Sequence, residues 1–176
     1  MTTHTPARLA AALLAAACLH AAAAPLARAE VPDPLKPWVP WVLHGNESRL
    51  CPAKFDDANQ RACVWPSKLE LRAGASGASF RFELQVFGGE AVVALPGEAE
   101  AWPQDVQADG RPVPVTGAGA RPAALLPAGR HVLAGSLPWS AMPQDLAVPP
   151  GIGIVTLAID GREEARAPGP DGRLWL

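Results

Sequence analysis

The chain has 176 residues and a formal net charge of −2, with 15 Lys and Arg against 17 Asp and Glu. Lysine occurs only three times and the arginines are scattered, so there is no basic stripe of the kind that binds nucleic-acid phosphates. Although 49% of the residues are hydrophobic, no apolar run reaches the roughly 20 residues of a membrane-spanning helix. We therefore expect neither nucleic-acid binding nor a membrane span.

The first 29 residues have the features of a secretory signal peptide. Arg8 lies near the start, an apolar run covers residues 9–19, and an Ala-Arg-Ala site precedes Glu30. We expect cleavage after Ala29 and an exported protein, periplasmic or associated with the cell envelope. The alternative is a lipoprotein attached through Cys18, which follows three alanines. Cleavage leaves 147 residues, enough for one core, with a net charge of −4 because two arginines leave with the leader.

Residues 30–66 are predicted to form a Pro- and Trp-rich opening segment and a loop. Four prolines, at positions 32, 34, 37 and 40, fix φ and remove backbone donors. This pattern disfavours a helix or a central strand and predicts an extended, polyproline-like stretch. We expect it to lay Trp38 and Trp41 on the body of the domain and to end in an edge strand at residues 41–43.

The mature chain keeps two cysteines, Cys51 and Cys63, which are 12 positions apart. The spacing is not the CxxC of a thioredoxin motif, and two cysteines do not make a zinc site. Downstream of an export signal, an even pair most simply forms one structural disulfide.

Residues 67–87 show the clearest secondary-structure signal in the chain. Apolar and polar side chains alternate on both sides of Gly74-Ala75-Ser76-Gly77, which suits a hairpin loop. The apolar members of the alternation are Leu69, Leu71, Phe80, Phe82, Leu84 and Val86. The predicted hairpin has one apolar face, which needs a cover from the rest of the chain.

Further short strands are predicted through residue 166. They cover residues 90–95, 102–108, 111–116, 123–126, 130–137 and 154–159, with a hairpin turn at Asp109-Gly110 and one helical turn near 140–146. The apolar run 154–159 is typical of a strand buried on both faces. Short strands with frequent turns predict an all-β fold, an antiparallel two-sheet β-sandwich of Ig-like or jelly-roll-like type, with its core in residues 67–166. Residues 167–176 read as a linker and the first strand of a further domain.

No catalytic constellation is visible in the sequence. The GxSxG motif is absent, and the mature chain has only two histidines, His44 and His131. We interpret His131 as a hydrogen-bonded interior or boundary residue. A hydrolase would need one of the two as its base. His44, beside Gly45 in a loop near Glu47, could ligate a metal only together with distant partners. Acidic residues such as Glu83, Glu90 and Asp105 are not paired by the sequence.

Neither a metal nor a cofactor is predicted. Asp56, Asp57 and Asn59 place oxygen ligands suited to calcium in the cysteine loop, but the EF-hand glycine and terminal Glu are absent, so we interpret them as solvated loop residues. Gly151-Ile152-Gly153 precedes a strand rather than a helix, which excludes a dinucleotide loop.

The chain has six tryptophans and no tyrosine, and five of the six lie beside or near proline. Two interpretations remain open. Trp65, Trp102 and Trp139 suit the open ends of a sandwich, which their indoles would close. Alternatively, Trp38, Trp41 and Trp102 are candidate ligand-binding residues, because flat indole faces bind sugar rings.

Three stretches of the sequence together resemble a known group of proteins. They are VPDPLKPWVPWVLHG, WPQDVQADGRPVPV, and LPAGRHVLAGSLPW with the following VPPGIGIVTLAIDG. They resemble the amino-terminal region of long, uncharacterised exported cell-envelope proteins of GC-rich Gram-negative bacteria, which continue past the DGRLWL point. The resemblance implies a fragment or truncated relative and carries over no catalytic residue. We therefore expect a non-catalytic exported module with a structural or protein-interaction role, whose partner is an envelope protein or a further domain. The alternative is a carbohydrate-binding module.

Overall fold

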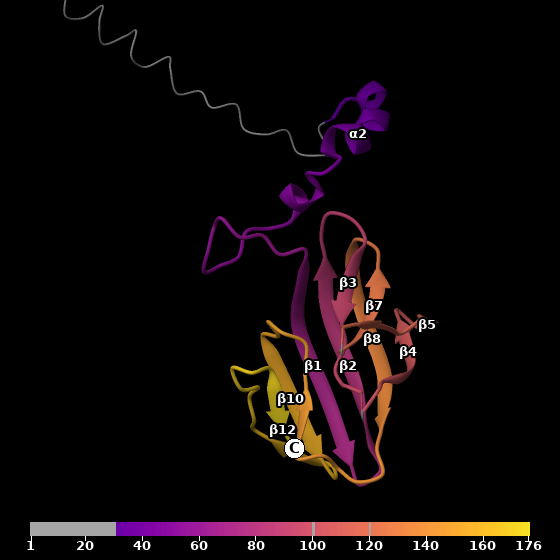
Figure 1. Ribbon diagram of the computed structural model, residues 1–176, viewed down its shortest axis with the longest axis vertical. Coiled ribbons are helices and arrows are strands. Elements are labelled where there is room, and N and C mark those ends of the chain that lie inside the picture. Colours follow the sequence, from indigo (N-terminus) through magenta and orange to yellow (C-terminus); the bar gives the residue numbers. More distant parts are fainter. Residues whose placement is uncertain (1–30, 100, 120) are drawn as a thin grey trace, which may run out of the picture. The chain divides into compact units, whose positions relative to one another are not determined.

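The computed structural model describes residues 31–99, 101–119 and 121–176. The chain divides into two compact units, one ending at Leu43 and the other covering His44–Leu176. Strands make up 49% of the described residues and helices 10%, so the all-β prediction is confirmed (Figure 1). No helix among the described residues has the length and hydropathy needed to cross a bilayer.

The described part of the first unit is helical, which makes the prediction of an extended segment with an edge strand wrong. A 3₁₀ helix, η3 (Asp33–Trp38), runs into a short α-helix, α2 (Val39–Leu43). Pro34 and Pro40 are each the second residue of their helix. The N–H groups of the first turn have no partner within the helix, so proline loses no hydrogen bond there, and its fixed φ suits a helical turn. Trp38 and Trp41 are 61% and 75% exposed, and their rings meet edge to face with centroids 6.5 Å apart.

The second unit begins with a short 3₁₀ helix, η4 (Glu47–Leu50), and the cysteine loop, and then forms a seven-stranded sheet. In spatial order the sheet contains β11 (Arg162–Glu164), β10 (Ile154–Ile159), β1 (Val64–Gly74), β2 (Gly77–Val86), β8 (Gly129–Pro138), β4 (Gln104–Ala108) and β5 (Arg111–Pro112). The predicted hairpin of residues 67–87 is its centre, as β1 and β2. The Asp109-Gly110 turn joins β4 to β5 with both residues at positive φ, as predicted.

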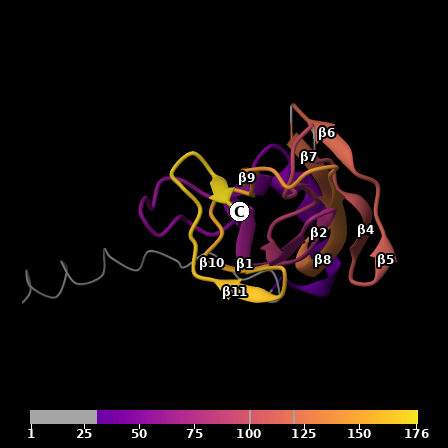
Figure 2. The same ribbon diagram turned by 90° about the horizontal axis from the view of Figure 1, so that it is seen from below.

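Two small sheets form the opposite layer. One contains β3 (Ala91–Ala94), β7 (Arg121–Leu126) and β6 (Thr116–Ala118), and the other pairs β9 (Asp145–Ala147) with β12 (Arg173–Trp175). Seen along the strands, β6, β7 and β9 lie on one side and β1, β2, β8 and β10 on the other (Figure 2). The apolar side chains of both layers form one buried cluster between them, which is the core of a sandwich-like fold.

Two details differ from the predicted strands. The β10 strand pairs with β1 in parallel, and only Leu157 of its six residues is buried, so the run is not covered on both faces. Residues 140–146 contain no helix but lead into β9.

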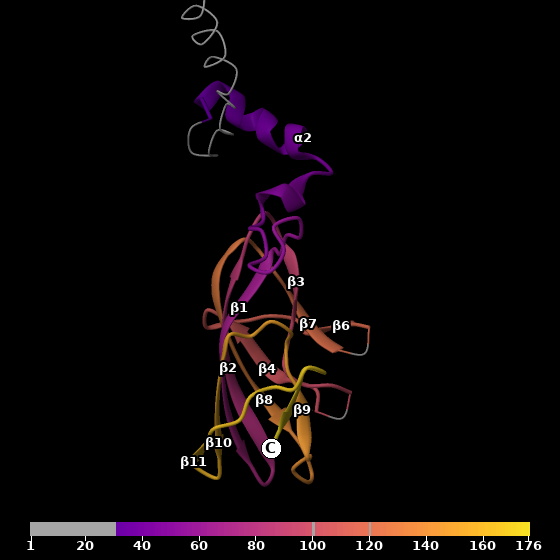
Figure 3. The ribbon, with the colours of Figure 1, turned by 90° about the vertical axis from the view of Figure 1, so that its left-hand side faces the viewer.

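The carboxyl-terminal residues belong to this unit, contrary to the prediction that they start a further domain. Strand β12 pairs antiparallel with β9, and Leu174 is fully buried in the core. Figure 3 shows the chain's end lying against the strands. Apolar residues at a chain end are buried where a neighbouring edge strand is available to pair with them.

The predicted disulfide between Cys51 and Cys63 is confirmed. It closes a loop that is also held by a backbone bridge between Ala53 and Arg61 and by the Arg61 guanidinium, which donates to the Cys51 carbonyl at 2.8 Å. Cys51 is almost completely buried, at 1% exposure. The loop is thereby fastened to the sandwich just before β1.

We expect a Cys51→Ala/Cys63→Ala variant to lose about 3 kcal/mol of unfolding free energy, because the unfolded chain gains the entropy of the opened loop. Urea denaturation followed by far-UV circular dichroism measures the loss. Dithiothreitol should lower the stability of the wild type by a similar amount and leave the variant unchanged. A loss below about 1 kcal/mol would show that the bond contributes little.

Candidate functional site

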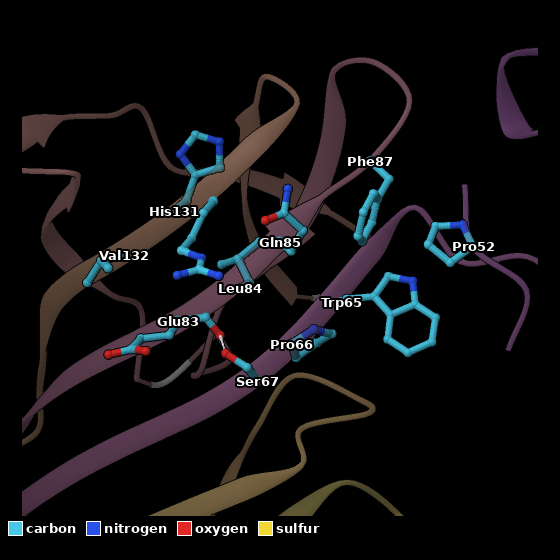
Figure 4. Close-up of a pocket in the computed structure, with 11 residues that line it drawn as sticks. Pro52, Trp65, Pro66, Ser67, Glu83, Leu84, Gln85, Phe87, His131 and Val132 are labelled. Carbon is cyan, nitrogen blue, oxygen red and sulfur yellow. Dashed lines mark hydrogen bonds between the residues drawn. The ribbon is translucent and has the colours of Figure 1, made fainter. Parts of the chain in front are cut away.

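A groove with a volume of about 680 Å³ lies on the outer face of β1, β2 and β8 (Figure 4). Its floor is the part of the sheet next to the disulfide loop. The side chains that line it include aromatic, polar and charged ones. Among them, Trp65 lies on β1, Gln85 on β2 and Arg130 on β8. The groove is therefore a candidate binding surface on rigid strands rather than on loops.

A β-bulge turns Trp65 toward the groove. The pairing of β1 with β2 shifts register between Pro66 and Lys68, so that Trp65 lies opposite Gln85. Without the extra residue, the alternation would point Trp65 toward the core. The indole N–H donates to the Ala62 carbonyl at 2.6 Å, which fixes the ring while leaving the residue only half-buried.

Two rows of side chains cross the groove. Trp65, Gln85 and Arg130 are direct cross-strand partners and form the first row. Glu83 and Val132 are partners in the second row, beside the bulged Ser67, whose hydroxyl donates to the Glu83 carbonyl at 2.8 Å. Since neighbouring strands are about 4.8 Å apart, each row spans about 10 Å across three strands.

The disulfide loop closes one end of the groove. Pro52, next to Cys51, faces Phe87 in Figure 4. The Phe87 amide donates to the Cys63 carbonyl at 2.8 Å, so both residues are tied to the disulfide. A second groove of about 420 Å³ also has Trp65 in its wall, together with the fully exposed Phe55 of the cysteine loop. The indole thus stands between two grooves.

The charges in the groove are balanced. Glu83 carries the negative charge and makes a 3.5 Å ion pair with Arg81 outside the groove, with both side chains well exposed. The Arg130 guanidinium has no ion-pair partner among the described residues. Gln85 donates one amide hydrogen to the Val86 carbonyl at 3.2 Å, which leaves its second hydrogen and its oxygen for other partners.

His131 is a buried, hydrogen-bonded residue, as predicted, with 8% exposure. Its Nδ1 lies 2.8 Å from Oδ2 of Asp109, and its Nε2 lies 2.9 Å from the Pro127 carbonyl oxygen. Each ring nitrogen therefore lies within hydrogen-bond distance of an oxygen. In Figure 4 the ring points away from Trp65 and Ser67. This histidine fastens two turns to β8 and has neither nitrogen open to a substrate.

Asp109 is the acidic partner in this arrangement. A hydrogen bond from the Val132 amide, followed by the one from His131, lowers the pKa of the Asp109 carboxyl below its ordinary value of 3.8. A carboxylate with a lowered pKa stabilises the fold above the pKa of the unfolded chain, and this contribution is lost as pH falls through the folded pKa.

We expect Asp109→Asn to cost about 1 kcal/mol at neutral pH, because a charged acceptor becomes a neutral one. Asn tolerates the positive φ of 52° at this position, so the backbone is not disturbed. The variant's stability should also fall less steeply than that of the wild type below about pH 4. Urea midpoints measured from pH 2 to 7 test this, and parallel acid limbs in the two proteins would contradict it.

Of the other predicted site residues, Trp38 and Trp41 belong to the first unit. Half-buried Trp102 belongs to the second unit but does not line the groove, and it approaches Gly117 of β6. Trp139 packs against the core and donates to the Gly74 carbonyl at 3.0 Å, as expected for an indole at a sandwich end. The structure therefore does not bring Trp102 to Trp65, and the sequence did not single out Trp65 as a ligand-binding residue.

Within the described parts of the chain, no three His, Cys, Asp or Glu side chains come close enough to hold a metal ion. The calcium candidates in the cysteine loop include Asp57, whose carboxylate accepts bonds from the Asn59 amide at 2.9 Å and from Gln60 Nε2 at 3.0 Å. The first of these bonds is the main reason why the pKa of Asp57 lies below its usual range. These contacts shape the loop itself.

The sequence matches no protein-family model and no curated protein. Among solved structures, the fold is similar to an M1 zinc metallopeptidase from Deinococcus radiodurans, with 10% identity and a TM-score of 0.36 over 65% of this chain and 38% of that one. A variant of that enzyme bound to a Tyr-Ser-Ala substrate matches with the same score over 39% of its chain. This chain thus spans less than two-fifths of those proteins, and similarity of this degree says nothing about activity.

Proposed function

We propose that this chain is an exported, non-catalytic β-sandwich module that binds a component of the cell envelope through the outer groove. The observation that supports this proposal is the composition of the groove. It places a half-buried indole beside polar side chains on the face of paired strands, where the geometry is held by the core beneath. Binding surfaces of this mixed kind, with a few placed polar groups, are typical of ligand sites.

The non-catalytic role is supported by the contacts of His131 and by the single acidic side chain of the groove wall. His131 is occupied at both ring nitrogens, and its ring points away from the groove. Glu83 is the one acidic side chain among the residues of the groove wall, so a pair of carboxylates for hydrolysis is lacking there. The groove lining therefore suits binding better than bond cleavage.

Export is supported by the signal-like leader and by the disulfide, which forms and persists in oxidising compartments. To test it, the full chain is produced in a Gram-negative host, the cells are fractionated, and the intact mass is measured. We expect a periplasmic or envelope-bound product that begins at Glu30 and is 2 Da lighter than its reduced form. A lipid-modified product beginning at Cys18 supports the lipoprotein alternative, and a 176-residue cytoplasmic product would refute export.

Binding at the groove is tested by sedimentation of the mature chain with washed envelope fragments from the same host. We expect Trp65→Ala to reduce the bound fraction severalfold. Trp175→Ala is the matched control, because Trp175 is also a half-exposed indole, on β12, but does not line the groove. Equal retention of the two variants would refute the groove as the binding surface.

A further inference from the structure

We infer that the groove binds an uncharged oligosaccharide, with the Trp65 indole as the stacking surface and Gln85 as the main polar contact. This inference rests on the proposed function and specifies its ligand. It also places sugar binding on residues different from Trp38, Trp41 and Trp102, the tryptophans that the sequence singled out.

The first argument is the setting of Trp65. Its indole is fixed by the 2.6 Å bond to Ala62 yet remains half-exposed at the groove wall. A ring whose N–H is already satisfied presents only its apolar surface. Such a surface suits the apolar C–H face of a pyranose, and a ring that is already ordered loses little conformational entropy on binding.

The second argument is the balance of donors and acceptors beside the indole. Gln85, directly opposite Trp65, has a free amide hydrogen and a free oxygen. Arg130 next to it only donates, and Glu83 one row away only accepts. Sugar hydroxyls donate and accept at once, so they can use all three groups. The single positive and single negative charge favour an uncharged ligand over an anion or a cation.

The third argument concerns the backbone. The central strand of the groove, β2, is paired along its full length with β1 on one side and β8 on the other. The neighbouring stretch of β1 contains Pro66, which has no N–H. An added peptide strand would need unpaired backbone groups, so the groove must recognise its ligand through side chains.

The rows give the expected size of the ligand. Trp65, Gln85 and Arg130 span about 10 Å across three strands. This length suits two linked sugar rings, one on the indole and one between Gln85 and Arg130. Oligomers should therefore bind more tightly than the corresponding monosaccharides.

Isothermal titration of the purified full chain with neutral oligomers of N-acetylglucosamine, glucose and mannose tests the inference. We expect at least one series to bind, the disaccharide more tightly than its monomer. Trp65→Ala should weaken binding at least tenfold, and Gln85→Ala about three- to tenfold. The control Trp175→Ala should leave the affinity unchanged. Gln85→Ala keeps the test valid if Trp65→Ala fails to fold, which thermal melting of each variant reveals.

Three results would overturn the inference. If no neutral oligosaccharide binds while Trp65→Ala still releases the chain from envelope fragments, the groove binds another class of ligand and only the proposed function stands. Binding of a proline-rich peptide in place of the sugars would likewise show that the groove binds another class of ligand, so that only the proposed function stands. If sugar binding survives both groove variants and Trp65→Ala leaves envelope binding intact, the inference and the proposed binding surface both fail.

Discussion

Replacing Phe82 by alanine is expected to remove about 3 to 5 kcal/mol of unfolding free energy. Phe82 lies in the middle of β2 and has no exposed surface. Its cross-strand partners, Leu69 on β1 and Leu133 on β8, are also fully buried. Truncation would leave a cavity between three strands whose backbones are held by hydrogen bonds and cannot close around it.

A domain of this size has roughly 5 to 15 kcal/mol of stability, so the Phe82→Ala variant should be partly unfolded well below the melting temperature of the wild type. Urea denaturation with the disulfide intact measures the change. Arg81→Ala is the control, because Arg81 directly precedes Phe82 in β2 and is exposed. It should change the unfolding free energy by no more than about 0.5 kcal/mol. Comparable losses for the two variants would contradict the assigned faces of β2.

The alternation of β2 that makes Phe82 a core residue was readable from the sequence, because the two-residue period of a strand is a local property. Phe80, Phe82 and Leu84 are buried while Arg81 is exposed and Glu83 and Gln85 are only half-buried. The same local reasoning predicted the Asp109-Gly110 turn from two residues that tolerate positive φ. The core face of β2 and the turn after β4 could therefore be predicted without any tertiary information.

Strand neighbours could not be predicted in the same way, because pairing depends on the whole chain. The parallel pairing of β10 with β1 joins residues 86 positions apart, and nothing within residues 154–159 specifies it. The helical turns at residues 33–43 were missed for a different reason. The prolines were interpreted as helix breakers, although Pro34 and Pro40 occupy first-turn positions that need no backbone donor, and only Pro37 lies inside its helix.

The candidate site was missed because its main residue depends on a bulge. Plain alternation from Leu69 back to Trp65 puts the indole on the core face, and one extra residue reverses this. A signal was present in Pro66, since a proline inside a strand often marks a bulge or an edge. The core and the groove are linked by this geometry, because the strands that bury Leu84 inward carry Gln85 outward.

The second large loss of unfolding free energy is expected for a substitution in the short strand β12. Leu174→Ala is expected to cost about 3 to 5 kcal/mol, because Leu174 is fully buried and contributes to the common core from the last residues of the chain. The neighbouring Arg173 forms ion pairs with Glu98, at 2.7 Å, and with Asp145. Both contacts raise the pKa of the Arg173 guanidinium above its ordinary value, and the hydrogen bond to Glu98 has the larger effect. Since the guanidinium is charged in both folded and unfolded chains, this pairing adds no pH dependence near neutrality.

The neighbouring Trp175→Ala serves as the matched control for Leu174→Ala. Trp175 is 58% exposed on the opposite face of the same strand, so removing the larger side chain should cost less than about 1 kcal/mol. Urea denaturation of both variants measures the difference. If β12 instead belonged to another folding unit, Leu174→Ala would cost no more than Trp175→Ala, and hydrogen exchange would find the Leu174 amide as poorly protected as a frayed chain end. A large cost confined to Leu174 would establish that β12 belongs to the core of the sandwich.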